Sequence, residues 1–296
     1  MTAKTRAEWV LVGATLIWGS TFVIGKFVLR EMTPLQMIFL RFGLATVIIF
    51  ALGYKTIFPL RPDQILKGVV LGIFLYFGFV AQTVGLMLTT ASKSAFLTGM
   101  MVVFVPFLQI IVERRLPKLG NIVGVVAVAC GLWFLTSPAG AAFNAGDALS
   151  LLCALFFAVY IVYLDVVSDD MTAMQLTFVQ AAVNTILAAG SLLLFESAPW
   201  HFSGSVLGAV LFLTIFATVL TTFLQAKYQK FTTPTRATII FALEPIWAAG
   251  AAALFLGETL GWMGVFGGGL ILAGVLVSQI SEDIPFLGKS LDSLFS

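Results

Sequence analysis

Two charged side chains stand inside long apolar stretches that contain no other charge, and they are the first candidates for chemistry. Arg41 lies in the stretch 35–52 and Glu244 in the stretch 237–256. A charge among apolar groups is costly unless it is paired or binds a ligand. We therefore expect either a structural ion pair between Arg41 and Glu244, or a pair that opens and closes, or binds a zwitterion, as the protein works.

Uncharged polar and aromatic side chains inside the apolar stretches extend this candidate site. An amide or hydroxyl in apolar surroundings must bond to a neighbouring helix or line a wet cavity, so each of these residues has one of two roles. Trp247 lies three residues after Glu244 and is expected on the same helix face. With Arg41 and Glu244, the candidate solute-binding residues are Trp18, Thr21, Tyr76, Gln82, Thr98, Gln109, Tyr160, Gln180, Asn184, Gln225 and Trp247.

The other reactive residues favour no catalytic, metal or cofactor chemistry. Cys130 and Cys153 lie in separate apolar stretches without a CxxC pair, and the one histidine, His201, lies in an expected loop. Zinc sites and histidine-based triads are therefore excluded by count. The glycines of 260–280 follow no strand and precede no Lys-Ser or Lys-Thr pair, so a nucleotide-binding loop is not expected. We expect no cofactor, no bound metal and no enzymatic activity.

The apolar stretches are long enough to cross a membrane. Hydrophobic residues make up 60% of the 296 residues, charged residues only 10%, and the mean hydropathy is +1.06, whereas a soluble domain has about 25% charged residues. A net charge of +2 without a basic stripe gives no support for nucleic-acid binding. At about 20 apolar residues per crossing, ten spans are expected in an all-α integral membrane protein: 9–28, 35–52, 68–88, 94–112, 119–136, 148–164, 173–195, 204–225, 237–256 and 260–280.

The chain contains an internal repeat, with five spans in each copy. Thr33, Gln36 and Phe39 recur with the same spacing as Thr172, Gln175 and Phe178, and we call the shift from Thr33 to Thr172 the first offset. At a slightly larger shift, the second offset, Gln82, Thr89, Thr90, Lys93, Gly124 and Gly131 are matched by Gln225, Thr232, Thr233, Arg236, Gly267 and Gly274. One insertion in a loop would produce the change from the first offset to the second. Residues that either offset relates are called counterparts.

The odd number of spans in each copy has a consequence for the architecture. It inverts the second copy relative to the first, as is typical of secondary transporters. We expect residues 1–140 and 141–281 to form two inverted five-helix repeats, followed by a short cytoplasmic tail, 282–296.

The positions of lysine and arginine set the expected orientation. With the N-terminus in the cytoplasm, 12 basic residues fall on the inner side and 3 on the outer side, which is the bias that cytoplasmic loops show. Ten spans then return the C-terminus to the cytoplasm, and the expected location is the inner, cytoplasmic membrane. The first stretch is too long for the apolar core of a signal peptide and lacks a clear cleavage motif, so a retained span is expected.

The order of several short motifs resembles the EamA family of the drug/metabolite transporter superfamily. In the first copy they are Trp18-Gly19-Ser20-Thr21-Phe22, Thr33-Pro34, Arg41-Phe42 and Thr90-Ala91-Ser92. In the second they are Thr232 to Thr235, Glu244-Pro245 and Gly257-Glu258-Thr259-Leu260, before a glycine-rich last span. The motifs extend over essentially the whole chain.

This resemblance implies a ten-helix bundle in which the first four helices of each copy surround a central cavity and the fifth and tenth lie at the periphery. It also implies alternating-access transport of small metabolites, often amino acids. The chain departs from the family pattern where Phe157-Ala158-Val159-Tyr160 stands in the place of a second Trp-Gly motif. We therefore expect the two halves to contribute unequal contacts to a solute.

Prolines and glycines predict where helices break and where they pack. Pro106 and Pro245 fall in the fourth span of each copy, and a proline frees a backbone carbonyl about four residues earlier. Breaks at corresponding places of two repeats indicate a transporter's site, with a packing kink as the alternative. The glycines of the fifth and tenth spans predict close helix packing, and a homodimer through these two spans.

The favoured function is a secondary active transporter that moves a small metabolite, an amino acid or a similar amphipathic solute, across the cytoplasmic membrane, with export as the expected direction. The alternative is a membrane-embedded enzyme that acts on a lipid or acyl substrate. Such an enzyme needs clustered acids or histidines at an interface. The one acidic cluster, formed by Asp165, Asp169 and Asp170, is typical of a solvated loop.

Overall fold

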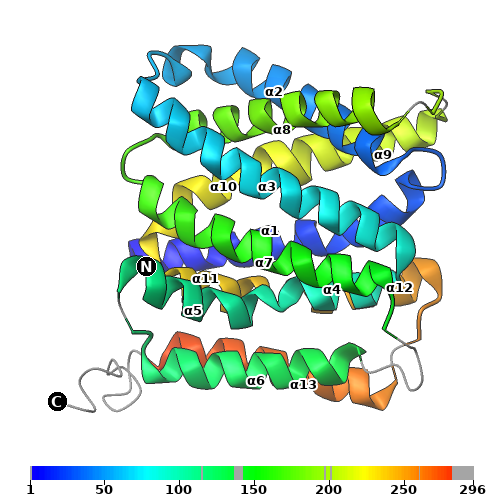
Figure 1. Ribbon diagram of the computed structural model, residues 1–296. Helices are drawn as coiled ribbons and strands as arrows, with labels where there is room; N and C mark the ends of the chain where they lie inside the picture. The colour runs from blue at the N-terminus through cyan, green and yellow to red at the C-terminus, as the bar shows by residue number, and fades with distance from the viewer. Residues whose placement is uncertain are drawn as a thin grey trace.

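The computed structural model describes residues 2–114, 116–136, 143–196, 198–200, 202–259 and 261–281, and within these ranges the chain is a bundle of helices (Figure 1). The first repeat contains α1 (Ala3–Val28), α2 (Pro34–Ile57), α3 (Pro62–Leu88), α4 (Ala91–Gly99), α5 (Met101–Glu113) and α6 (Leu119–Thr136). The second contains α7 (Ala145–Val167), α8 (Ala173–Phe195), α9 (Gly204–Thr214), a π-helical turn (Ile215–Leu220), α10 (Thr221–Tyr228), a 3₁₀ turn (Gln229–Phe231), α11 (Pro234–Phe241), α12 (Glu244–Leu256) and α13 (Trp262–Ile280). The expected tail, 282–296, lies outside the described residues.

The helices match the ten expected spans. In the described part of the chain, nine helical stretches are long and apolar enough to cross a membrane, and a shorter apolar helix covers Leu119–Phe134. The fourth span consists of α4 and α5, the eighth of α9, the π turn and α10, and the ninth of α11 and α12. The prediction of an all-α membrane protein built from two five-helix repeats is confirmed.

The second helix of each repeat begins at the same capping box. The Thr33 hydroxyl accepts a hydrogen bond from the Gln36 N–H (3.2 Å), and the Gln36 side-chain oxygen accepts one from the Thr33 N–H (3.1 Å). Thr172 and Gln175 repeat both bonds, at 3.2 and 3.0 Å. A box of this kind satisfies two backbone N–H groups that the first turn leaves without a helical partner. The repeated Thr-x-x-Gln pattern therefore marks the start of a helix.

Figure 1 shows how the helices are layered. α2 and α8 pack together on one side of the bundle, α6 and α13 pack together on the opposite side, and α1 and α7 lie between them. α6 and α13 are thus peripheral, as the family resemblance implied. α1 begins and α13 ends on the left of the figure. We call this the N-terminal end of the bundle and the other the far end.

An approximate two-fold axis passes between α2 and α8. Thr46 and Thr185 are related by the first offset and so occupy counterpart positions in the two repeats. Their hydroxyl oxygens lie 3.0 Å from each other. A residue can contact its own counterpart only where the symmetry axis passes, so this contact locates the axis.

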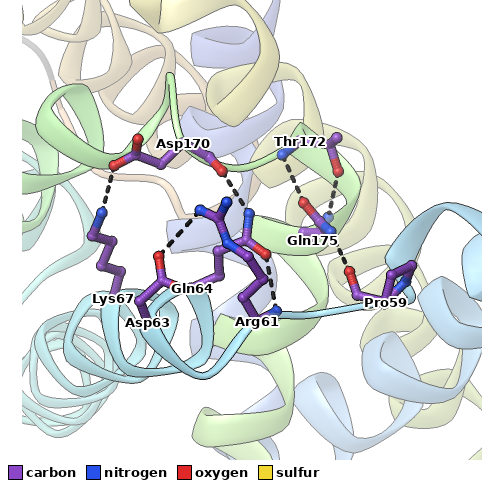
Figure 2. Close-up of polar contacts among 8 residues, drawn as sticks. All are labelled: Pro59, Arg61, Asp63, Gln64, Lys67, Asp170, Thr172 and Gln175. Carbon is purple, nitrogen blue, oxygen red and sulfur yellow. Dashed lines mark hydrogen bonds and ion pairs between the residues drawn. The ribbon is translucent and has the colours of Figure 1, made fainter.

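The glutamines of the two capping boxes also make equivalent contacts across this axis. The Gln36 amide donates a hydrogen bond to the Ala198 carbonyl (3.1 Å), just beyond the end of α8. The Gln175 amide donates to the Ile57 carbonyl (3.1 Å) at the end of α2. It also donates to the Pro59 carbonyl (3.3 Å), as Figure 2 shows. Each helix start therefore holds the end of its partner helix in the other repeat.

Figure 2 also shows the contact between the α7–α8 connection and the start of α3. The Gln64 amide donates to the Asp170 carbonyl (2.7 Å), and the Lys67 ammonium lies 2.6 Å from the Asp170 carboxylate. The hydrogen bond and charge of Lys67 lower the pKa of Asp170. Because both charges are exposed, the pair stabilises the fold little.

Glycines allow α6 and α13 to cross closely. A Cβ atom on Gly131 would lie 2.7 Å from the Gly267 carbonyl oxygen, and one on Gly274 would lie 2.8 Å from the Gly124 carbonyl oxygen. Gly131 is the counterpart of Gly274, and Gly267 is the counterpart of Gly124. The two contacts between the helices therefore have the same form. The predicted helix packing is present within one chain. Other glycines of α13, such as Gly268, face open space, since an added Cβ there would meet nothing within 4 Å. The homodimer stays a prediction.

Candidate solute cavity

A partly open cavity lies between the two repeats, with about 570 Å³ of space not filled by atoms, counting the open part. Its lining residues are Trp18, Thr21, Arg41, Leu75, Phe79, Gln82, Met101, Phe157, Tyr160, Ile161, Thr222, Gln225, Phe241 and Glu244. They come from spans one to four of the first repeat and from spans six, eight and nine. The peripheral helices α6 and α13 contribute none of them.

Most of the lining consists of counterpart positions from the two repeats. Five counterpart pairs line the cavity: Trp18 with Phe157, Thr21 with Tyr160, Phe79 with Thr222, Gln82 with Gln225, and Met101 with Glu244. The first two pairs follow the first offset and the other three follow the second. Only the two glutamines are identical. Equivalent backbone positions therefore present different side chains from the two sides of the cavity.

The fourth span of each repeat is broken beside the cavity. Between α4 and α5, the Met100 N–H donates to the Leu97 carbonyl at 3.2 Å. Between α11 and α12, the Leu243 N–H donates to the Ile240 carbonyl at 3.0 Å. The two donors are counterparts by the second offset, and so are the two acceptors. Each bond spans three residues, which is the spacing of a 3₁₀ turn rather than an α-helix. The expected breaks at corresponding places are present.

The two prolines stand differently toward these breaks. Pro245 is the second residue of α12 and directly follows its break. A proline in a first turn is tolerated because its missing N–H would have no helical partner there. Pro106 lies inside α5, well after the break at Met100. The carbonyl that Pro106 frees, about four residues earlier, lies close to the break at Met100, whereas Pro245 directly adjoins its own break.

Glu244 is the first residue of α12 and lines the cavity, with only 8% of its surface exposed. Among the residues that the structure describes, no hydrogen bond or ion pair joins its carboxylate to another side chain. The dipole of a helix favours negative charge in its first turn. The carboxylate is therefore electrostatically supported by its own helix and remains available to a cationic group in the cavity.

Arg41 is held by the π-helical turn of the eighth span. Its Nε donates to the Thr218 hydroxyl (2.5 Å), its Nη2 donates to the Ala217 carbonyl (2.9 Å), and its guanidinium carbon lies 4.6 Å from the centre of the Phe79 ring. The Thr218 hydroxyl donates in turn to the Leu213 carbonyl, five residues earlier (2.9 Å). A π turn widens the helix by one residue. Here the Thr218 side chain and the Ala217 backbone of this turn fix the guanidinium in place.

Arg41 and Glu244 line the same cavity without pairing. Each is more than nine-tenths buried. In the described part of the chain no ion pair joins them, and the hydrogen bonds of Arg41 go to the π turn instead. Of the two hypotheses for these charges, the structural ion pair is therefore absent from this conformation. The cavity holds two opposite charges that a solute can approach.

Seven of the thirteen expected site residues line the cavity, and the other six lie in helix contacts. The six are Tyr76, Thr98, Gln109, Gln180, Asn184 and Trp247. The Tyr76 hydroxyl donates to the Ser191 hydroxyl (2.6 Å), which joins α3 to α8. The Asn184 amide donates to the Gly72 carbonyl (3.1 Å) between the same two helices. For these residues the helix-to-helix role applies and the cavity role does not.

Two more of the six hold the broken fourth spans. The Gln109 side-chain oxygen accepts hydrogen bonds from the Thr235 hydroxyl (2.6 Å) and N–H (3.2 Å), which caps the start of α11. Thr98 is buried with its hydroxyl 3.9 Å from the Cys153 sulfur. Both side chains therefore join different repeats to each other instead of facing a solute.

Trp247 faces α1 and the surface instead of the cavity. Its residue is 39% exposed and its indole N–H donates to the Thr15 hydroxyl (3.1 Å). Close approach here depends on Gly19, because a Cβ at that position would lie 2.5 Å from the Trp247 Cβ. The expectation that Trp247 shares the cavity-facing side of Glu244 is thus wrong.

Gln180 is fully buried beside the Tyr160 hydroxyl, and its side chain makes no hydrogen bond of ordinary geometry within the described residues.

Seven lining residues escaped the sequence-based prediction: Leu75, Phe79, Met101, Phe157, Ile161, Thr222 and Phe241. All but Thr222 are apolar or aromatic without a polar group, which makes them look like ordinary core residues. The internal repeat contains the missing signal. Phe157 and Met101 are the counterparts of Trp18 and Glu244, so transferring each candidate to the other repeat would have found them.

Comparisons with known proteins agree on the family and the fold. The model of the EamA-like transporter family matches residues 5–137 and 144–279. An Archaeoglobus fulgidus protein named "Uncharacterized transporter" is 32% identical over 274 residues, covering 93% of this chain and 86% of its own. A second A. fulgidus protein of that name is 22% identical over 279 residues, covering 91% and 98%. A solved structure described only as a crystal structure of a protein matches with a TM-score of 0.78 at 16% identity, over 94% of this chain and 97% of its own.

Proposed function

Because the chain belongs to the EamA-like transporter family, we propose that it is a secondary active transporter for a small amphipathic solute, such as an amino acid. It exports this solute across the cytoplasmic membrane by alternating access, with its N- and C-termini in the cytoplasm. The movement is driven by an existing gradient, either of another species or of the solute itself. The 12 basic residues on the proposed inner side, against 3 on the outer side, support this orientation.

The observation that carries the proposal is the carboxylate of Glu244, which has no partner among the described residues and lies in the same cavity as Arg41. An amino acid presents an ammonium and a carboxylate to its surroundings. Glu244 is available to the ammonium and Arg41 to the carboxylate, while Trp18, Phe157 and Phe241 offer apolar and aromatic surface to a side chain. A few charged groups placed among apolar walls are typical of small-molecule sites.

The broken helices support alternating access through this site. In secondary transporters with inverted repeats, solutes bind near the repeat interface at discontinuous helices, and one repeat moves against the other around the site. Here both fourth spans break at counterpart residues, Met100 and Leu243, and Glu244 directly follows the second break. The cavity therefore adjoins the backbone segments that can bend most readily.

The proposal is tested by transport into liposomes that contain the purified protein. The internal solutes are labelled amino acids, nucleobases and quaternary amines, each with and without a pH gradient. We expect efflux of at least one amino acid, and loss of that efflux in Glu244→Gln. Asp169→Asn is the matched control, because it also removes one carboxylate but at an exposed position outside the cavity.

Retained folding of Glu244→Gln is checked by the melting temperature of the detergent-solubilised protein. An unaltered protein that moves none of the solutes contradicts the proposed substrate class. Normal efflux in a correctly folded Glu244→Gln protein contradicts the proposed role of the carboxylate. Turnover of a lipid in the absence of any solute movement favours the alternative of a membrane-embedded enzyme.

A further inference from the structure

Two buried ion pairs lie at opposite ends of the bundle. At the far end, the Lys93 ammonium is 2.5 Å from the Asp147 carboxylate, and the two side chains are 15% and 0% exposed. At the N-terminal end, the Arg236 guanidinium is 2.5 Å from the Glu8 carboxylate, with exposures of 5% and 8%. Both pairs are much less exposed than the surface pair of Lys67 and Asp170.

The two ion pairs are counterparts of each other. The first offset relates Glu8 to Asp147, and the second relates Lys93 to Arg236. Each acid lies in the first span of its repeat and each base lies in the first turn of the fourth span. Each pair joins a first span to the fourth span of the other repeat. The inverted symmetry therefore places one copy of the same ion pair at each end.

The same four spans line the cavity between the pairs. The first spans contribute Trp18 and Tyr160, and the fourth spans contribute Met101 and Glu244. Each ion pair therefore joins two of the helices that line the cavity, one pair toward each end of it. With both pairs closed, the structure is in a conformation that is latched at both ends.

We propose that these two ion pairs are the alternating gates of the transporter. The far-end pair separates while the N-terminal pair is closed, and the N-terminal pair separates while the far-end pair is closed. The proposal rests on the proposed function, since it gives alternating access its two latches. It assigns to Glu8, Arg236, Lys93 and Asp147 a role that is separate from solute contact, because none of them lines the cavity.

The energetics of buried ion pairs suit such gates. Bringing two charges together in a dry interior gains attraction but loses their hydration, and the two contributions nearly cancel. A gate that opens admits water, so each separated charge regains hydration. A closed pair and an open, wet pair therefore differ little in free energy, as a two-state element requires. A closed gate with one partner removed would bury an unpaired charge, which is much more costly.

The two gates are not equally secured. The Asp147 carboxylate also accepts hydrogen bonds from the Thr89 hydroxyl (2.7 Å) and the Asn144 N–H (2.9 Å). The counterpart of Thr89 is Thr232, whose buried hydroxyl has no hydrogen-bond partner in the described structure. Glu8 thus lacks the hydroxyl contact that supports Asp147. The N-terminal gate should open more readily, which in the proposed orientation admits solute from the cytoplasm.

The test measures which end of the bundle gives access to the cavity. The two cysteines are replaced by alanine, and Thr222→Cys places one thiol in the cavity. A membrane-impermeant thiol reagent is then added to right-side-out or inside-out vesicles, in the absence of solute. The labelling rate from each side reports how often that end is open.

Neutralising one gate should shift access toward that gate. Glu8→Gln combined with Arg236→Gln should raise labelling from the N-terminal end about tenfold and lower it from the far end. Lys93→Gln combined with Asp147→Asn should shift labelling in the opposite sense. Double variants are used because they leave no buried charge unpaired. In the unaltered protein, labelling should be faster from the N-terminal end.

The matched control is Lys67→Gln combined with Asp170→Asn, which removes an exposed ion pair between the repeats and should leave both labelling rates unchanged. Charge-swapped pairs, such as Lys93→Asp with Asp147→Lys, should label like the unaltered protein. The gate proposal is overturned if the two neutral variants change the labelling rate equally from both ends, or do not change it at all. A swapped variant that labels like the neutral one overturns the ion-pair mechanism. Because no solute is present, failed amino-acid transport would contradict the proposed function without affecting this result.

Discussion

Gln36 of the first repeat and Gln175 of the second make the same contact, each with the end of the partner helix across the two-fold axis. Five residues further along the same two helices, the counterparts Arg41 and Gln180 differ completely. Arg41 is bound to the π turn and reaches the cavity, whereas Gln180 is fully buried beside Tyr160. The two repeats are alike where they hold each other and, apart from Gln82 and Gln225, unlike where they face the cavity.

This difference separates two requirements of the proposed transport cycle. Two conformations that open to opposite sides need similar free energies, and equivalent contacts between inverted repeats provide that balance. A solute with two different ends needs unlike groups around it. Here one repeat supplies the cation, Arg41, and the other supplies the anion, Glu244. In the proposed cycle, symmetric contacts thus serve the motion, and asymmetric lining serves recognition.

The largest expected effect comes from making the two repeats alike at Glu244. Glu244→Met gives this position the side chain of its counterpart Met101, and transport should fall roughly 30-fold or more, since losing a buried charge contact costs about 2 kcal/mol or more. The melting temperature should not fall, because an unpaired buried charge is removed. Initial efflux rates and a thermal unfolding curve measure both. Glu244→Met that exports at the normal rate would show that the asymmetry at this position does not matter.

A smaller effect is expected at the π turn that only the second repeat possesses among the described residues. Thr218→Val removes the hydroxyl that holds the Arg41 Nε, and solute affinity should fall about tenfold, as for a lost hydrogen bond to a charged group. Thr221→Val is the control, because the Thr221 hydroxyl is buried without a hydrogen-bond partner in the described part of the chain. Binding is measured by the solute concentration that half-saturates efflux. Equal losses in both variants would contradict a specific role of Thr218.

The smallest expected effect tests the part in which the repeats agree. Gly131→Ala and Gly274→Ala each place a Cβ against a backbone carbonyl at the α6–α13 crossing, and each should destabilise the fold by about 1 kcal/mol. Similar losses are expected because the crossings are counterparts. Gly268→Ala should have little effect, since its Cβ would meet no atom within 4 Å. Thermal unfolding in detergent compares the three, and unequal losses at the first two positions would break the equivalence.

The sequence was sufficient for the fold because the decisive signals are local or additive. Each span is recognisable from its own length and apolarity, and the inversion follows from five spans per repeat. The recurrence of Thr33 and Gln36 as Thr172 and Gln175 revealed the repeat, and the structure then showed a capping box at both places. The site was harder to predict. Gln82 and Gln225 line the cavity while Gln109 caps a helix, and nothing in the local sequence distinguishes these glutamines, because the difference lies in how each helix is rotated about its axis.

By itself, the sequence determined that this chain crosses a membrane ten times, that its halves are inverted, and that Arg41 and Glu244 are the exceptional charges. These properties depend on composition, length and counting, which no packing arrangement alters. Only the tertiary structure decided the partners of those charges. Arg41 bonds to a π turn far away in the sequence, and Glu244 remains unpaired among the described residues. Glu8 pairs with Arg236, and Asp147 pairs with Lys93, each across the two repeats. Such choices depend on helix rotation and on where helices break, which are settled only when distant segments pack together.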